Sequence, residues 1–320
     1  MKKINNHFVF RLLNIHFLNL VRFYYFRVIG YRYAKFKTSY GNVFLDIKNK
    51  GISKHLALYF SREKDKMFLI ADILKENDYV IDCGSNIGVY PYYISNIIKK
   101  NGKIYCVEPD PRNIETLKKN LTLLKSDYSF SQIALNNKDE EINFLMKSAS
   151  NLGHIHYDKE EYSNKAMNNK NSELVKVNGM TLKTYITKNK IKPNKIKLIR
   201  MDIEGSESEV INQILEMQDE FKNLNIVFEN HPEFYSQKSL DFKDILSKLI
   251  NVGYAIRYVV SAGEVMPKKF SDYNLKPYKI IKTDGYKRGI YRNLDPQTSI
   301  ELITSVPKIV RYALMTRNEK

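Results

Sequence analysis

Apolar and polar positions along this chain fall into blocks with two different periods. Short continuous apolar runs predict buried strands at 79–83, 103–108, 128–135, 195–201 and 225–228. Between them, apolar residues recur at every third or fourth position and predict helices at 62–76, 87–99, 111–124, 206–217 and 239–250. Additional strands are expected at 141–147, 174–177, 254–260 and 287–292. Alternating strands and helices indicate an α/β fold with a doubly wound, mainly parallel sheet and an antiparallel edge strand.

The distribution of charge changes how the ends of the chain are interpreted. The formal net charge is +17, and segments 1–37 and 302–320 together hold 11 of these excess positive charges. Residues 1–37 contain eight basic side chains and no acidic one. We therefore expect a basic amphipathic extension at 1–50, one globular domain at 51–295 and a basic C-terminal helix at 296–320. Within the domain, the Ser-, Asn- and Lys-rich stretch 148–172 predicts a loop or lid.

The N-terminal extension has an apolar stripe at helical spacing. The stripe consists of Phe10, Leu13, Phe17, Leu20, Val21, Tyr24 and Val28, and Arg11, Asn14, Asn19 and Arg22 lie on the other side. Polar residues interrupt each run before it reaches about 18 apolar positions, so we expect no membrane span. Two interpretations stay open. The helix lies in a membrane interface through residues 1–37, or it packs on the domain or on a dimer partner.

The number and positions of the cysteines indicate in which cellular compartment the protein is expected. The only two cysteines, Cys83 and Cys106, both lie in strand patterns, and no further cysteine suggests a disulfide framework. The sequence therefore predicts a cytoplasmic protein with a reduced pair, which can be peripheral at the inner face of the membrane.

The loop after the strand at 79–83 carries the most informative residues. Asp82 is in that strand, and Gly84, Asn86 and Gly88 follow in a tight turn before a helix. The next strand ends in Glu108, which is placed to accept ribose hydroxyls. A carboxylate at this loop would repel the pyrophosphate of a dinucleotide, whereas it suits a ligand with an ammonium and a sulfonium group. We therefore predict a site for S-adenosylmethionine.

From Leu69 to Glu229, the motif core of the domain, the chain resembles the FkbM family of S-adenosylmethionine-dependent methyltransferases. The motifs are Asp-x-Gly-Ser-Asn-x-Gly at 82–88, Glu-Pro-Asp-Pro at 108–111, Ala-Leu at 134–135, Asn-Leu-Gly at 151–153 and Arg-x-Asp-x-Glu-Gly-x-Glu at 200–207. The resemblance implies a class I methyltransferase fold, which is Rossmann-like, and methyl transfer to oxygen, often on sugars of glycans or on secondary metabolites.

The resemblance also implies roles for single residues. Those expected at the cofactor are Asp82, Gly84, Asn86, Gly88, Glu108, Pro109, Ile133 and Ala134. The first four would surround the methionine end, Glu108 would accept both ribose hydroxyls, and the backbone near Ile133 would flank the adenine. Asn151 and Gly153 are expected at the substrate or in the lid.

A base next to the acceptor would assist transfer to a sugar hydroxyl, because such a hydroxyl holds its proton tightly. Asp202 is the first choice for this base or for orienting the acceptor, since parallel strands place their carboxyl ends on the ligand side of the sheet. Glu204 and His231 follow as catalytic candidates. Glu207 and Glu229 are expected near the substrate, although Glu207 suits a helix N-terminus equally well.

The same residues could be considered for a metal ion. Asp202, Glu229, Asn230 and His231 could together hold a hard divalent cation, and His154 and His156 form a second pair. Neither group is a closed ligand set, so we predict no metal site.

Three functions stay open. The leading hypothesis is O-methylation of a sugar, glycan or other small molecule, which can be lipid-linked if the N-terminal helix lies on a membrane. The basic charge would also suit an RNA methyltransferase. However, Asp202-Ile203-Glu204-Gly205 stands where methylases of base amino groups carry Asn/Asp-Pro-Pro-aromatic, so we expect no specific nucleic acid. The third hypothesis is a membrane-surface module that keeps the fold without catalysis.

Overall fold

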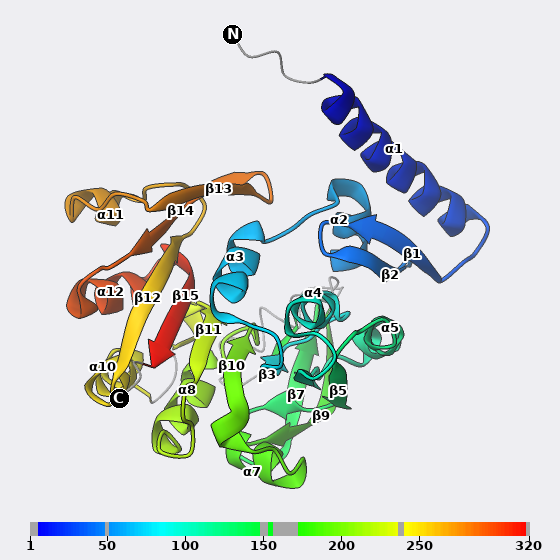
Figure 1. Ribbon diagram of the computed structural model, residues 1–320. Helices are drawn as coiled ribbons and strands as arrows, with labels where there is room; N and C mark the ends of the chain where they lie inside the picture. Colours follow the sequence, from blue (N-terminus) through cyan, green and yellow to red (C-terminus); the bar gives the residue numbers. More distant parts are fainter. Residues whose placement is uncertain (1–5, 49–50, 148–152, 156–171, 236–239, 318–320) are drawn as a thin grey trace.

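A nine-stranded sheet forms the centre of the protein in the computed structural model, which describes residues 6–48, 51–147, 153–155, 172–235 and 240–317 (Figure 1). In spatial order its strands are β13 (Lys279–Thr283), β14 (Tyr286–Arg292), β12 (Tyr254–Ser261), β15 (Val310–Arg317), β11 (Asn225–Glu229), β10 (Ile196–Met201), β3 (Tyr79–Cys83), β4 (Lys103–Val107) and β5 (Asp127–Ser131). The strands from β11 to β5 are parallel, and the remaining pairs are antiparallel. The α/β, mainly parallel class is confirmed, and antiparallel pairing extends well beyond a single edge strand.

Helices cover both faces of this sheet. One face packs against α3 (Lys64–Ile73), α4 (Val89–Ile98) and α5 (Pro111–Leu121). The other packs against α7 (Leu182–Lys188), α8 (Glu207–Glu216), α10 (Phe242–Asn251), α11 (Lys268–Asp272) and α12 (Pro296–Ile303). Along β3, Val80 enters the first core and Ile81 the second. Because both faces are buried, the parallel strands are continuously apolar in the sequence.

A smaller sheet lies next to the carboxyl ends of the parallel strands. Its order is β6 (Ala134–Leu135), β9 (Glu173–Met180), β7 (Glu141–Met146) and β8 (His154–Ile155). The strands expected at 141–147 and 174–177 are confirmed by β7 and β9. Most of the predicted lid at 148–172, with Asn151 and His156, lies outside the described residues.

The N-terminal extension is more than a helix. It consists of α1 (Asn6–Val28) and the hairpin β1 (Tyr33–Thr38) and β2 (Gly41–Asp46), and α2 (Ile52–Tyr59) follows. The Asn120 side chain fastens the hairpin to α5 through the Phe44 backbone N–H at 2.7 Å and carbonyl at 2.9 Å. The predicted polar side of α1 is partly wrong, because Asn19 is buried and donates to the Lys37 carbonyl at 3.0 Å. Among the described helices, none has the length and apolar character needed to cross a bilayer.

The predicted helix at 296–320 is wrong beyond Ile303. After α12, residues 310–317 form β15, which lies between β11 and β12. This strand is buried on both faces, so its apolar residues do not alternate with polar ones and can be mistaken for a helical stripe. Arg311 of this strand does not contribute to a basic surface, because its guanidinium lies 3.1 Å from the carboxylate of Glu229.

Candidate active site

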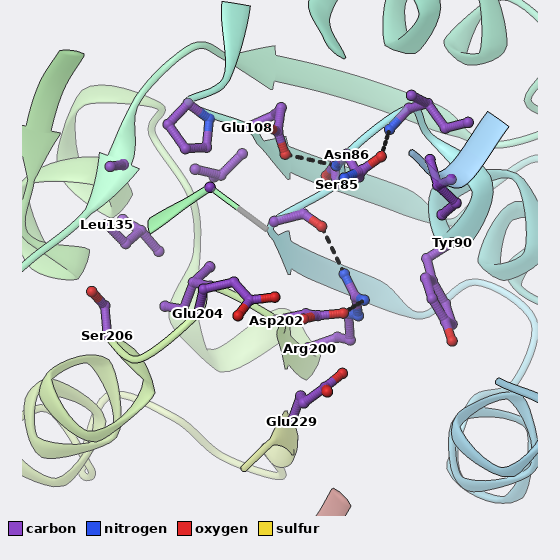
Figure 2. Close-up of a pocket in the computed structure, with 18 of the residues that line it drawn as sticks. Ser85, Asn86, Tyr90, Glu108, Leu135, Arg200, Asp202, Glu204, Ser206 and Glu229 are labelled. Atoms are coloured by element: carbon purple, nitrogen blue, oxygen red, sulfur yellow. Dashed lines mark hydrogen bonds and ion pairs between the residues drawn. The ribbon is translucent and has the colours of Figure 1, made fainter. Parts of the chain in front are cut away.

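A cavity of about 380 Å³ opens at the carboxyl ends of the parallel strands β3, β4, β10 and β11 (Figure 2). Its volume lies within the range of small-molecule sites, about 300–1,000 Å³. The predicted residues that line it are Gly84, Asn86, Glu108, Pro109, Ile133, Ala134, Gly153, Asp202, Glu204, Glu229 and His231. Asp82, Gly88 and Glu207 are buried and are not part of the wall.

The loop after β3 adopts a conformation that depends on Gly84. Its φ is +80°, a left-handed value that residues with a side chain rarely adopt. A Cβ at this position would also overlap the backbone carbonyl oxygen of Asp202. The N–H groups of Gly84 and Ser85 both donate to the Val107 carbonyl at 2.9 Å, which holds the loop against the end of β4.

Asp82 supports this loop from below. Its carboxylate is fully buried, accepts the Ser85 hydroxyl at 2.7 Å and pairs with the Arg200 guanidinium at 3.1 Å. The expectation that Asp82 faces the ligand therefore does not describe its position, because its charge is neutralised behind the cavity wall. Its role here is to connect the loop to β10.

Glu108 is the acid that does face the cavity. One carboxylate oxygen accepts the Asn86 N–H at 2.7 Å, and the other accepts the Asp110 N–H at 3.0 Å and the Asn113 amide at 3.1 Å. Burial raises the pKa of Glu108 to about 7, and these donors oppose that shift. The carboxylate is thus fixed in orientation at the end of β4.

The wall beyond Glu108 is largely apolar. Ile133, Ala134 and Leu135 come from the segment at β6, and Phe144 and Ile155 come from β7 and β8. This end of the cavity can enclose a flat, weakly polar group. Phe144 and Ile155 had no signal in the sequence, because only strand pairing in the smaller sheet brings them here.

An acid–base cluster occupies another part of the wall. His231 lies 3.5 Å from Glu204 through Nε2 and 3.1 Å from Glu207 through Nδ1. Although burial opposes it, the neighbouring carboxylates, Glu207 first, raise the pKa of His231 to about 9. Burial raises the pKa of Glu204 to about 7 against the effect of His231. Glu204 also has a left-handed φ of +49°, the kind of backbone strain that collects at functional sites.

Glu207 organises the turn that carries Glu204. Its carboxylate accepts the backbone N–H of Ile203 at 2.9 Å and of Gly205 at 2.8 Å. It is fully buried and receives the Tyr235 hydroxyl at 3.2 Å. The alternative of a structural acid at the start of α8 therefore describes Glu207 better than contact with the substrate.

Asp202 is held by two cations. Its Oδ2 accepts Lys66 Nζ at 2.6 Å and Arg200 Nη2 at 2.7 Å. A proton on this oxygen would disrupt both ion pairs, so Asp202 is better suited to hold charge in place than to act as a base. Glu229, the other carboxylate considered as a metal ligand, also pairs with Lys66, at 3.3 Å. Cationic side chains therefore already contact both of these carboxylates.

Residues 82–256 match the profile of the methyltransferase FkbM domain. The chain belongs to the FkbM methyltransferase family. A search of the curated proteins finds no match. Solved structures with a similar arrangement include an S-adenosylmethionine-dependent O-methyltransferase from Thermotoga maritima, with 13% identity and a TM-score of 0.40 over 89% of this chain and 77% of that one. TYW2 from M. jannaschii has 12% identity and a TM-score of 0.40 over 90% and 87% of the two chains.

S-adenosylmethionine is the methyl donor of this FkbM-family enzyme. The cavity has the features that this donor requires. Gly84 exposes its backbone without a side chain, the carboxylate of Glu108 is a fixed hydrogen-bond acceptor, and the wall beyond it is apolar.

Sequence reasoning missed the charged end of the FkbM-family cavity. Arg62 and Glu63 line it from the segment between α2 and α3, and Arg311 lines it from β15. Fully buried Lys66 bonds to Glu63 at 3.0 Å and so joins this group to Asp202. Lys66 lies about one turn before Leu69 and Ile70, on the apolar side of α3. Lysine is rarely buried without a partner, so a lysine at this position could have indicated a buried ion pair.

Proposed function

We propose that this FkbM-family methyltransferase methylates a hydroxyl group of a sugar, a glycan or another small molecule. The observation that carries the proposal is Glu204, a cavity-lining carboxyl whose pKa is raised to about 7. A base that titrates near neutral pH is suited to remove the proton of an attacking hydroxyl.

Each group of residues has a place in this proposal. S-adenosylmethionine supplies an electrophilic methyl group when bound. Gly84, Asn86 and Glu108 orient it, and water is excluded by the apolar wall. The carboxylate of Glu204 takes the proton of the acceptor hydroxyl, while protonated His231, 3.5 Å away, stabilises that carboxylate in its ionised form. Asp202 is assigned to orienting the acceptor, in place of the base that the sequence first suggested.

RNA is the alternative acceptor, and the distribution of cations argues against it. The cations at or near the cavity, Arg62, Lys66, Arg200 and Arg311, are all engaged with carboxylates. Nucleic-acid binding requires cations that are free to neutralise phosphates. The acceptor is therefore better sought among neutral or weakly charged small molecules, including lipid-linked sugars.

Transfer of labelled methyl from S-adenosylmethionine into a total cell extract tests this proposal. The extract is split into lipid, polysaccharide, protein and nucleic-acid fractions after incubation with the full chain. We expect label in the lipid or polysaccharide fraction, or in the small molecules that remain once the four fractions are removed, and much less label with Glu204→Gln. Glu264→Gln, which changes an exposed acid, serves as the matched control. Label confined to nucleic acid would overturn the proposal, and cofactor binding without any transfer would favour the non-catalytic module.

A further inference from the structure

The C-terminal half of α1 has apolar side chains on two sides. One side packs on the protein, where Phe23 is fully buried and contacts Phe36. The other side is exposed and carries Phe17, Leu18, Val21, Tyr24, Tyr25 and Val28, which we call the apolar face. Val28 is 85% exposed and Phe17 64%. Exposed apolar residues in such a continuous set mark an interaction surface rather than ordinary scatter.

Helical geometry confirms that the apolar face is continuous. At about 100° per residue, Phe17, Val21, Tyr24 and Val28 fall within an arc of about 60°, and Leu18 and Tyr25 widen it to about 120°. The buried side of the helix, with Asn19 and Phe23, lies opposite. In Figure 1, α1 extends away from the sheet, so its outer side is not covered by the described domain.

Positive charge surrounds the apolar face. Arg22 and Arg27 lie on its two flanks by the same geometry, and Lys35 and Lys37 on neighbouring β1 are exposed. The first 45 residues contain no acidic side chain. An apolar helix face with arginines on its flanks is typical of helices that lie in a membrane interface.

We infer that the apolar face of α1 binds an anionic membrane surface and makes the protein peripheral to that membrane. A second copy of the chain is a poorer occupant, because it would bring together two segments with the same strong positive charge. Nucleic acid would use the arginines but would leave Leu18, Val21 and Val28 without a partner. At a bilayer, these side chains enter the acyl boundary, Tyr24 and Tyr25 reach the head groups, and the arginines contact anionic lipid.

The same arrangement connects the membrane face to the cavity. Helix α2 packs on α1, and Ile52 at the start of α2 lines the cavity. A lipid-linked acceptor would therefore be presented to the enzyme from the surface on which α1 lies. Membrane binding itself does not depend on the identity of the acceptor.

Vesicle co-sedimentation of the full chain tests this inference. We expect binding to vesicles that contain phosphatidylglycerol, little binding to pure phosphatidylcholine, and weakening with salt. Arg22→Gln/Arg27→Gln should weaken partitioning about 30-fold, since each surface arginine contributes about fivefold. Tyr24→Asp/Val28→Asp should abolish it.

The matched control is Tyr128→Asp/Ile280→Asp, which places the same charges at exposed apolar positions on β5 and β13. It should bind vesicles like the wild type, and unchanged thermal unfolding of all variants shows that each one folds. Wild-type protein that stays in the supernatant with phosphatidylglycerol overturns the inference. So does a lipid-free oligomer that Tyr24→Asp/Val28→Asp dissociates, or pelleting with RNA but not with vesicles.

Discussion

Two glutamates in the cavity reach a similar pKa, about 7, in different surroundings. Burial is the largest cause for both. Glu108 is immobilised by three N–H donors, which suits a carboxylate that binds hydroxyl groups. Glu204 instead has a cationic imidazole beside it, which suits a group that gains and loses a proton. The different roles proposed for the two glutamates thus rest on the neighbours of each side chain.

Glu108 should make cofactor affinity dependent on pH. In the proposed function the ionised carboxylate accepts the ribose hydroxyls, so affinity should be highest well above pH 7 and fall as the pH drops through the pKa of about 7. Binding measured by calorimetry should be about tenfold weaker at pH 6 than at pH 8. Glu108→Ala should weaken binding by about 10- to 100-fold and remove the pH dependence. An unchanged profile in this variant would assign the titration to another group.

Glu204 should control the rate. Glu204→Gln should lower kcat by about 10²- to 10⁴-fold and leave cofactor binding in place. In the wild type, kcat should rise with pH through about 7 as the Glu204 carboxyl ionises. His231→Asn removes the cation that lowers the pKa of Glu204, so the profile should move to higher pH. If Asp202→Asn loses turnover and Glu204→Gln does not, the base is Asp202.

At the scale of elements, the site depends on two connections that bring neighbouring strand ends together. The loop after β3 touches both the end of β4, through Val107, and the turn after β10, through Asp202. Asp82 and Arg200 form an ion pair across β3 and β10, which are neighbours in the sheet. A disturbance of one loop should therefore affect both the cofactor end and the catalytic turn.

Gly84→Ala tests this connection. The variant combines a left-handed φ, which costs about 1 kcal/mol for alanine, with a steric overlap at the Asp202 carbonyl. We expect a marked fall in the melting temperature and loss of cofactor binding by calorimetry. Gly263→Ala is the control, since its φ of +76° is similar and nothing lies within 4 Å of the added Cβ. Equal effects of the two substitutions would show that strain alone is responsible.

At the scale of the molecule, the C-terminal hairpin supports a site built from the other end of the sheet. Asp284, between β13 and β14, accepts the Glu63 N–H at 3.1 Å, and Thr283 accepts the Lys64 N–H at 3.0 Å. Arg288 on β14 pairs with Asp65 on α3 at 2.8 Å, and both side chains are buried. The segment that places Glu63 at the cavity wall and Lys66 behind it is therefore fixed by residues more than 200 positions away in the sequence.

Breaking this pair should be costly. Arg288→Met leaves Asp65 buried without its cation and should lower the free energy of unfolding by about 3–5 kcal/mol. Burial raises the pKa of Asp65, and the loss should shrink at low pH because a protonated Asp65 carries no charge. Chemical denaturation measures the effect, and Asp65→Leu/Arg288→Met should recover much of it. Lys268→Met, which breaks an exposed pair with Asp272, should change stability by less than about 1 kcal/mol.

The local sequence determined the parts of this protein that depend on neighbouring residues. The buried strands, the glycine turn after β3 and the family motifs at 82–88 and 200–207 were all predictable, because period, turn chemistry and spacing are local properties. The family and the methyl donor followed from the same residues.

Only the tertiary structure decided which charges meet. Asp82 lies behind the cavity wall, where it pairs with Arg200 of β10. Asp202 is ion-paired because Lys66 of α3 contacts it. Residues 310–317 form an interior strand, β15, because they pair with β11 and β12 on either side. This position places Arg311 beside Glu229 in the site. Burial and charge pairing depend on segments that are distant along the chain. Periodicity and motif spacing are local properties, so they cannot predict these contacts.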